Sequence, residues 1–254
     1  MGRSVGYAGG RATRAWQNQS MTTSPPDGDA GPPVTLAEAY ALVTPDDSRE
    51  LYARWAATYE SDFVDGSGYV IPDRVAEEFA DVAGQLDGTV LDVGCGTGLV
   101  AFALVRDTAG EGVDWVIDGA DISPEMLAAA GDKQRPDGRK LYRRLIEVDL
   151  TGDLRARTDL LDAGYAAVVS AGTFTHGHLG PETLAALVPL GRPGAIFAIG
   201  INFEHFEGRG FAQCLAGLLE TGQIRNLDPR IVEMYRPGSA HDGDQAVVAI
   251  FRRA

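Results

Sequence analysis

Hydrophobic and polar positions alternate in short blocks along most of this chain. From Thr89 onward, five apolar runs rich in β-branched residues predict strands: Val90–Val93, Trp115–Ala120, Leu145–Val148, Ala166–Val169 and Ala195–Ile201. Apolar residues at helical spacing lie between most of them, in Leu99–Arg106, Pro124–Ala130 and Pro181–Leu190. Strands that alternate with helices in this way are typical of a parallel sheet covered on both faces.

The end of the chain follows a different pattern. After a predicted helix over Phe206–Thr221, two more strands are predicted, Ile231–Arg236 and Ala246–Arg253, with a short loop from Pro237 to Asp244 between them. A loop of this length permits an antiparallel return and leaves no room for a crossover helix. The predicted fold is therefore α/β: a Rossmann-like, seven-stranded, mostly parallel sheet that ends in an antiparallel C-terminal hairpin.

Helices are predicted ahead of the sheet. Thr35 can cap a short helix over Leu36–Val43, and the segment from Thr44 to Asp47 combines a capping residue, a first-turn proline and two acids. This second helix carries an aromatic face, and a third one begins at Pro72 and ends near Gly84. We predict a disordered tail at 1–34, an N-terminal helical lid at 35–88 and the main domain at 89–254. The acid-free start leaves open a transit peptide or an initiator at Met21.

Charge and cysteine content narrow the function classes. The 22 Lys and Arg against 36 Asp and Glu give a net charge of −14 at pH 7, which disfavours a polyphosphate partner such as nucleic acid. No apolar run approaches the ~20 residues that span a bilayer. Two cysteines, Cys95 and Cys214, form neither a disulfide framework nor a Cys-rich metal site. We expect no membrane, no metal and a cytoplasmic location.

The strongest chemical signal is the glycine-rich segment from Val90 to Gly98, VLDVGCGTG, which runs from a strand into a helix. Glycines let a backbone turn tightly and approach a ligand where a Cβ atom would collide. Dinucleotide-binding folds usually have G-x-G-x-x-G, whereas Leu99 stands at the third glycine position here, which counts against an oxidoreductase. The segment resembles the nucleoside-binding loop of class I S-adenosylmethionine-dependent methyltransferases.

Acidic residues close the next two strands. Asp121 ends the second predicted strand, where a carboxylate can accept both ribose hydroxyls, and Asp149 ends the third, where the resemblance implies contact with the adenine amino group. With S-adenosylmethionine as the cofactor, the residues implied in its binding are Tyr52, Trp55, Tyr59, Asp92, Gly94, Cys95, Gly96, Gly98, Asp121, Ile122, Asp149, Leu150 and Ser170. Cys95 fits the loop because it is small.

Two histidines are candidates for the base. The segment from Ser170 to His178, SAGTFTHGH, is expected to be a loop after the fourth strand, where the family's cofactor and acceptor meet. Neutral imidazole is a competent base near pH 7, so His176 and His178 are the predicted catalytic residues, with His205 in reserve. His176 is favoured because it is nearer the strand end. A two-histidine metal site is the competing interpretation, and loop packing without chemistry is the third.

Other stretches suggest a subgroup. The aromatic helix from Leu51 to Asp62, the loop just described and the segment from Leu187 to Gly194 together resemble the Williams–Beuren-region methyltransferase-like branch, over residues 50 to 202. The amide-clamping motifs of amino-DNA methyltransferases are absent from the sequence. We therefore expect a small-molecule acceptor and a monomer or homodimer. A protein methyltransferase and a cofactor-binding module without turnover are the alternatives.

Overall fold

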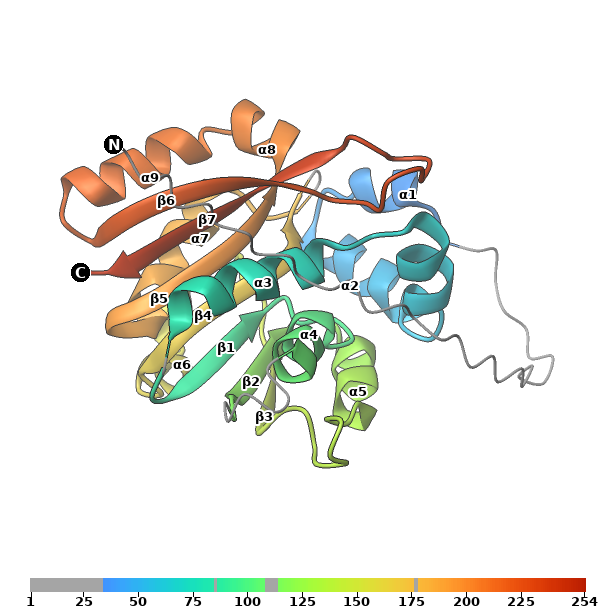
Figure 1. The fold of residues 1–254 in the computed structure, drawn as a ribbon, viewed down its shortest axis with the longest axis horizontal. Coiled ribbons are helices and arrows are strands. Elements are labelled where there is room, and N and C mark those ends of the chain that lie inside the picture. The colour runs from blue at the N-terminus through green and yellow to red at the C-terminus, as the bar shows by residue number, and fades with distance from the viewer. Residues whose placement is uncertain (1–33, 85, 108–113, 176–177) are drawn as a thin grey trace, which may run out of the picture. The chain divides into compact units, whose positions relative to one another are not determined.

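One mixed sheet organises the chain, seen in a computed structural model that describes residues 34–84, 86–107, 114–175 and 178–254 (Figure 1). The residues from Pro33 to Ala254 form one compact unit. The predicted tail lies outside the described residues except for Val34. The sheet has the order β3-β2-β1-β4-β5-β7-β6. Its strands are β1 (Thr89–Val93), β2 (Val116–Asp121), β3 (Arg144–Glu147), β4 (Tyr165–Phe174), β5 (Gly191–Asn202), β6 (Ile224–Glu233) and β7 (Gln245–Arg253).

The pairing confirms the predicted fold class. Strands β1 to β5 pair in parallel with one another, and β7 is antiparallel to both β5 and β6. Successive side chains of a strand point to opposite faces, so Val168 and Phe197 pack in one core while Ala167 and Ile196 pack in the other. The sheet is therefore buried on both sides.

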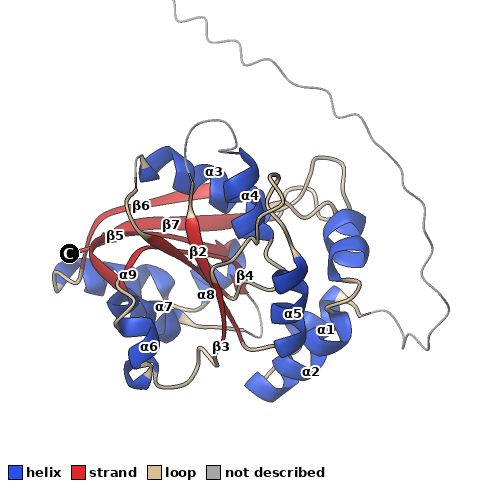
Figure 2. Ribbon diagram, turned by 90° about the horizontal axis from the view of Figure 1, so that it is seen from below, coloured by secondary structure: helices blue, strands red, loops and turns tan. Residues whose placement is uncertain are grey.

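Helices cover the two faces separately (Figure 2). One face carries α3 (Ile71–Ala83), α4 (Leu99–Asp107) and α5 (Pro124–Asp132), and the other carries α6 (Thr158–Leu161), α7 (Pro181–Leu187), α8 (Phe203–Gly208) and α9 (Phe211–Glu220). Two short 3-10 turns, Leu154–Ala156 and Val188–Leu190, complete the second layer. No helix within the described residues is long and apolar enough to cross a membrane.

The N-terminal region is helical, with different bounds from those predicted. Helix α1 spans Leu36–Tyr40, and α2 spans Pro45–Trp55 with Thr44 as its cap. The chain then enters a π-helix, η1 (Tyr59–Asp65), so Tyr59 does not belong to α2 as the periodicity suggested. Leu51 and Trp55 of α2 pack against Met126 of α5, which places these helices beside the sheet's carboxyl edge.

The bounds predicted for several other elements were wrong. Strand β4 continues through Ser170 to Phe174, because Phe174 still pairs with Ile201 of β5 after a register shift, so half of the expected loop is strand. The helix predicted over Phe206–Thr221 divides at Gly210, whose φ of 81° ends one helix and begins the next. Strand β6 begins at Ile224 rather than Ile231, and α6 was not predicted.

Candidate functional site

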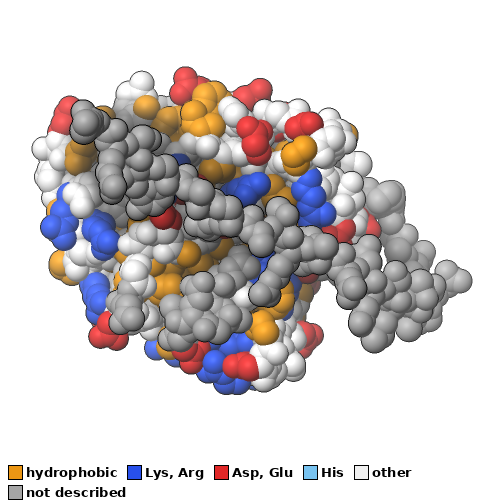
Figure 3. All heavy atoms as spheres, in the orientation of Figure 1, with side chains coloured by type: hydrophobic (Ala, Val, Ile, Leu, Met, Phe, Trp, Pro, Cys, Tyr) orange, Lys and Arg blue, Asp and Glu red, His pale blue; other side chains and the backbone are white. Residues whose placement is uncertain are grey.

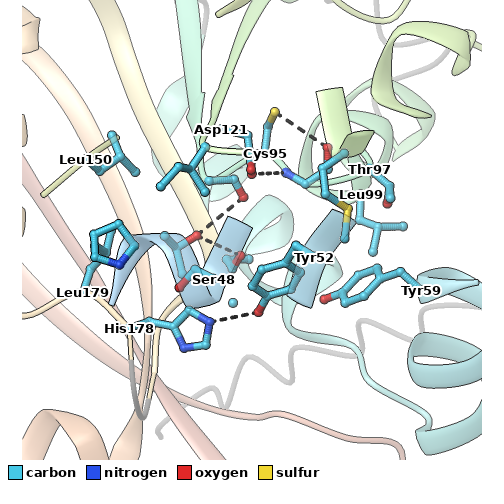
Figure 4. Close-up of a pocket in the computed structure, with 18 of the residues that line it drawn as sticks. Ser48, Tyr52, Tyr59, Cys95, Thr97, Leu99, Asp121, Leu150, His178 and Leu179 are labelled. Carbon is cyan, nitrogen blue, oxygen red and sulfur yellow. Dashed lines mark hydrogen bonds between the residues drawn. The ribbon is translucent and has the colours of Figure 1, made fainter. Parts of the chain in front are cut away.

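A cavity lies at the carboxyl ends of the parallel strands, with about 1070 Å³ of empty space that includes its opening to solvent (Figure 4). One wall comes from the loops after β1, β2 and β3, and the other comes from α2, η1 and the segment after β4. Of the residues predicted from sequence, the wall includes Tyr52, Tyr59, Gly94, Cys95, Gly96, Asp121, Ile122, Asp149, Leu150 and His178.

The glycine loop needs its glycines for two different reasons. Gly94 and Gly96 have φ values of 62° and 51°, in the left-handed region that other residues rarely adopt. A Cβ atom on Gly94 would lie 2.1 Å from Thr173 Oγ1, so close packing against β4 excludes it. A Cβ atom on Gly96 would meet no atom within 4 Å, because it would point into open space at the cavity. Gly96 therefore keeps room for a ligand.

Asp121 links the glycine loop to the end of β2. Its Oδ2 accepts the N–H of Gly96 at 2.8 Å, and its Oδ1 accepts the N–H of Ser123 at 2.9 Å. The side chain is buried, and burial raises the pKa of the carboxyl. A carboxylate has about four lone-pair sites, so it can also accept hydroxyls of a ligand in the cavity.

Asp149 and Leu150 lie further along the same wall. Asp149 Oδ1 accepts both the N–H and the hydroxyl of Thr151, at 2.8 and 2.7 Å, which fixes the loop after β3. Leu150 is buried and supplies an apolar surface beside Ile122. Leu150 and Ile122 thus form an edge of the cavity where a flat group could lie between aliphatic side chains, with Asp149 beside it.

Three predicted residues support the cavity from behind rather than lining it. Asp92 is fully buried, its Oδ2 accepts the Tyr142 hydroxyl at 2.7 Å, and burial raises the pKa of its carboxyl to about 7. Gly98 packs against Tyr142, whose ring a Cβ atom would approach to 3.0 Å. Ser170 lies within β4 and donates its hydroxyl to the Val93 carbonyl oxygen at 2.8 Å, so it ties two strands together.

The aromatic residues of α2 and η1 form a cluster at the opposite wall. Tyr52 and Tyr59 line the cavity, while Trp55 is buried behind them, with its ring 5.1 Å from that of Tyr59. Burial raises the pKa of the Tyr59 phenol well above its usual range, so this group stays neutral. The wall is therefore aromatic and uncharged at these positions.

Of the two predicted catalytic histidines, the structure places one. His176 lies outside the described residues. His178 lines the cavity, and its Nε2 is 2.9 Å from the Tyr52 hydroxyl, so the contact joins α2 to the segment after β4 (Figure 4). His205 lies on α8 outside the cavity lining, with its Nε2 3.0 Å from the Leu179 carbonyl oxygen. It holds the segment that carries His178.

Several lining residues were not predicted. Val43, Thr44, Pro45 and Ser48 bring the start of α2 to the cavity, and Tyr69, Thr151 and Thr173 complete its walls. The Thr44 cap was recognisable from sequence, but its position over the sheet edge depends on tertiary packing. Within the described residues, no three His, Cys, Asp or Glu side chains gather as a metal site.

The comparisons with known proteins agree with this geometry. Residues 90–194 match the family model described as a methyltransferase domain. A search of the curated proteins found no significant match. Among solved structures, the magnesium protoporphyrin IX methyltransferase ChlM from Synechocystis PCC 6803, with bound S-adenosylmethionine, has a TM-score of 0.57 at 15% identity, over 84% of this chain and 99% of that one.

Two other solved structures show how widely the fold is used. The CurJ carbon methyltransferase has a TM-score of 0.54 at 14% identity over 84% of this chain, and the alignment spans 61% of the CurJ chain. The [4+2]-cyclase SpnF has a TM-score of 0.55 at 18% identity, over 84% of this chain and 97% of that one. At these identities, the structural likeness shows the fold.

The fold is the one that these S-adenosylmethionine-dependent methyltransferases share, and residues 90–194 match a methyltransferase domain. S-adenosylmethionine is the cofactor of such domains. The residues present fit it, because Gly96 leaves open space above the loop and Asp121 presents a carboxylate to the same cavity.

Proposed function

We propose that this protein transfers a methyl group from S-adenosylmethionine to a small-molecule acceptor. The observation that carries the proposal is the cavity itself, which joins the cofactor loop on one wall to Tyr52, Tyr59 and His178 on the other. A donor held at the loop and an acceptor held at the aromatic wall would face each other inside one enclosed space. The 35–88 region would then act as a lid over the main domain at 89–254.

The cofactor contacts follow from the positions of the wall residues. Backbone groups of the loop from Gly94 to Thr97 face the cavity, and we assign Asp121 to the ribose hydroxyls. Asp149, with Ile122 and Leu150, would hold the adenine. The remaining predicted residues would hold the two walls in place. The wall at the cofactor loop would be fixed by Asp92, Gly98 and Ser170, and the aromatic wall would be fixed by Trp55.

Bound S-adenosylmethionine supplies a methyl group on a positively charged sulfur. The protein then needs to orient the acceptor and exclude water, and such positioning can supply most of the rate enhancement. His178 is our candidate for the base if the acceptor carries a proton: a neutral imidazole keeps one ring nitrogen without hydrogen, which can take that proton. Tyr59 cannot serve, because its raised pKa keeps the proton on its oxygen.

Partners of other classes fit less well. Lys and Arg side chains are interspersed with Asp and Glu on the face in Figure 3, and the net charge is −14, which favours a small acceptor over nucleic acid. SpnF, described as a [4+2]-cyclase, has the same fold, so a cofactor-binding protein with other chemistry is the second candidate. The Williams–Beuren branch, a cytoplasmic location and a monomeric or homodimeric state belong to the same proposal.

Calorimetric titration with S-adenosylmethionine and with its demethylated form tests the cofactor site. The wild type should bind both, and Asp121→Ala should lose roughly 1–3 kcal/mol of binding free energy because two ligand hydroxyls lose their acceptor. Asp162→Ala, an exposed acid at the end of α6, is the matched control and should bind as the wild type does. No binding of either compound to the wild type would refute the proposed function.

A further inference from the structure

A second cavity opens beside the first. It shares five wall residues with the first cavity, namely Tyr52, Tyr59, Tyr69, Gly172 and His178. Its other walls come from five helices and strands and from the loops between them. The residues that line these walls include Trp55, Phe63, Thr175, Met234, Tyr235 and Ala246. We call this second cavity the aromatic chamber. Because the two spaces meet at Tyr52 and His178, a molecule in the chamber could present one end to the cofactor cavity.

Six of the thirteen described residues that line the chamber are Tyr, Trp or Phe. Ring centroids of Trp55 and Phe63 are 5.3 Å apart, those of Phe63 and Tyr69 are 4.9 Å apart, and those of Tyr69 and Tyr235 are 5.5 Å apart. Their planes meet at 56°, 44° and 59°, so the rings present both faces and edges. Aromatic ligands favour such offset or edge-to-face contacts, which stabilise a ring beyond the burial of its area.

The chamber offers no formal charge to a ligand. Among the described residues that line it, none is Asp, Glu, Lys or Arg. A charged acceptor would lose its hydration on entry without gaining an opposite charge, which is strongly unfavourable. The walls therefore select a neutral molecule.

Two polar atoms on residues that line the chamber have no hydrogen-bond partner among the described residues. They are Trp55 Nε1 and Thr175 Oγ1, on side chains that are 2% and 8% exposed. A buried polar group without a partner destabilises the protein that carries it. A ligand with a polar substituent can satisfy such atoms when it binds, whereas a purely aliphatic ligand cannot.

We propose that the aromatic chamber binds the body of the methyl acceptor, and that this acceptor is a neutral, planar aromatic compound with a hydroxyl group. The ring lies among Trp55, Phe63, Tyr69 and Tyr235. The hydroxyl lies at the junction beside Tyr52 and His178, where it can also contact Thr175, whose carbonyl oxygen accepts the His178 N–H at 3.1 Å. This inference rests on the proposed function, since it assigns the acceptor class of the same site.

The probe for the test is 2-naphthol, titrated calorimetrically into protein saturated with the demethylated cofactor. Ala246→Leu places a larger side chain in the chamber and so reduces its free volume, at a residue that does not line the cofactor cavity. It should weaken naphthol binding by about ten-fold or more. Affinity for the demethylated cofactor should stay within about two-fold of the wild type. Ala216→Leu, on the exposed side of α9, is the matched control and should change neither.

A second variant keeps the test informative if Ala246→Leu fails to fold. Thr175→Val removes a hydroxyl that has no partner among the described residues, so it should fold at least as stably as the wild type while weakening naphthol binding. Naphthol affinity that is unchanged in both variants would overturn the proposal, as would equal affinity for 2-naphthyltrimethylammonium or naphthalene-2-sulfonate. If the wild type failed to bind the demethylated cofactor, the proposed function would fall, and naphthol titrated into the protein alone would still test the chamber.

Discussion

Replacing Asp92 with Asn should change how the stability of this protein depends on pH. Asp92 lies in β1 beneath the glycine loop with 0% exposure, and its Oδ2 accepts the neutral Tyr142 hydroxyl at 2.7 Å. Burial therefore raises the pKa of its carboxyl from 3.8 to about 7. Asn keeps the shape and can still accept the Tyr142 hydroxyl, but it does not titrate.

The magnitude follows from proton linkage. Because the pKa is higher in the folded state than in the unfolded state, the group contributes stability that is fully present below pH ~4 and is lost as pH rises through ~7. A difference of about 3 pH units at ~1.36 kcal/mol each gives about 4 kcal/mol in total, of which about 2.5 kcal/mol falls between pH 5 and pH 8. The stability of Asp92→Asn relative to the wild type should rise by this amount across that range.

Urea unfolding at pH 5, 6, 7 and 8, at constant ionic strength, measures the effect. The Asn amide introduces a buried donor, whose penalty does not vary with pH, so the informative quantity is the change with pH of the difference between the two proteins. Asp118→Asn is the control. Burial of Asp118 is outweighed by hydrogen bonds from Arg143 and Arg144, which lower the pKa of this carboxyl, so it stays ionised throughout the range. Its loss should destabilise equally at every pH. A pH-independent difference for Asp92→Asn would refute the reasoning.

Three further predictions concern the cavity. Gly96→Val should abolish most cofactor affinity in calorimetry, because its side chain would occupy the open space above the loop at a φ of 51°. Cofactor binding should slow hydrogen exchange in α2 more than in β7, since α2 lines the cavity and β7 does not. His178→Ala should lower turnover by roughly 10²–10⁴ while cofactor affinity stays nearly intact, and the loss should shrink for an acceptor without a proton to remove.

Each of these has a control or a contrary outcome. Gly138→Val has a comparable φ of 83° and equally open surroundings away from the cavity, so it matches the backbone strain and should leave cofactor affinity unchanged. Equal protection of α2 and β7 would mean that α2 is fixed packing rather than a lid. Near-normal turnover of His178→Ala would leave positioning and exclusion of water as the whole mechanism.

The sheet could be predicted because each parallel strand is a short apolar run bounded by glycines or helix caps, and these signals are local. The acids at the ends of β2 and β3 could be placed for the same reason, since chain order and strand direction bring them to one edge. The extension of β4 through Ser170 could not be predicted from the sequence, because it depends on pairing with β5 and on a register shift between Ser170 and Phe174.

The aromatic wall shows a second limit. The periodicity placed Tyr59 on the same helix as Tyr52, and the chain instead changes to a π-helix, which no local pattern indicated. The cluster still forms, because both elements pack against the same sheet edge. The contacts of Tyr142 with Asp92 and of Tyr52 with His178 join residues 50 and 126 positions apart, so no reading of local sequence could supply them.

Methyl transfer itself is tested most directly with S-adenosylmethionine that carries a trideuterated methyl group. The protein is incubated with this cofactor and a pool of small aromatic alcohols, and products are sought by mass spectrometry. The account predicts a product that carries the labelled methyl, formed by the wild type and lost in Asp121→Ala at cofactor concentrations that saturate only the wild type. Tight cofactor binding with no labelled product from any hydroxyl, amine, thiol or carbon acceptor in the pool would contradict it.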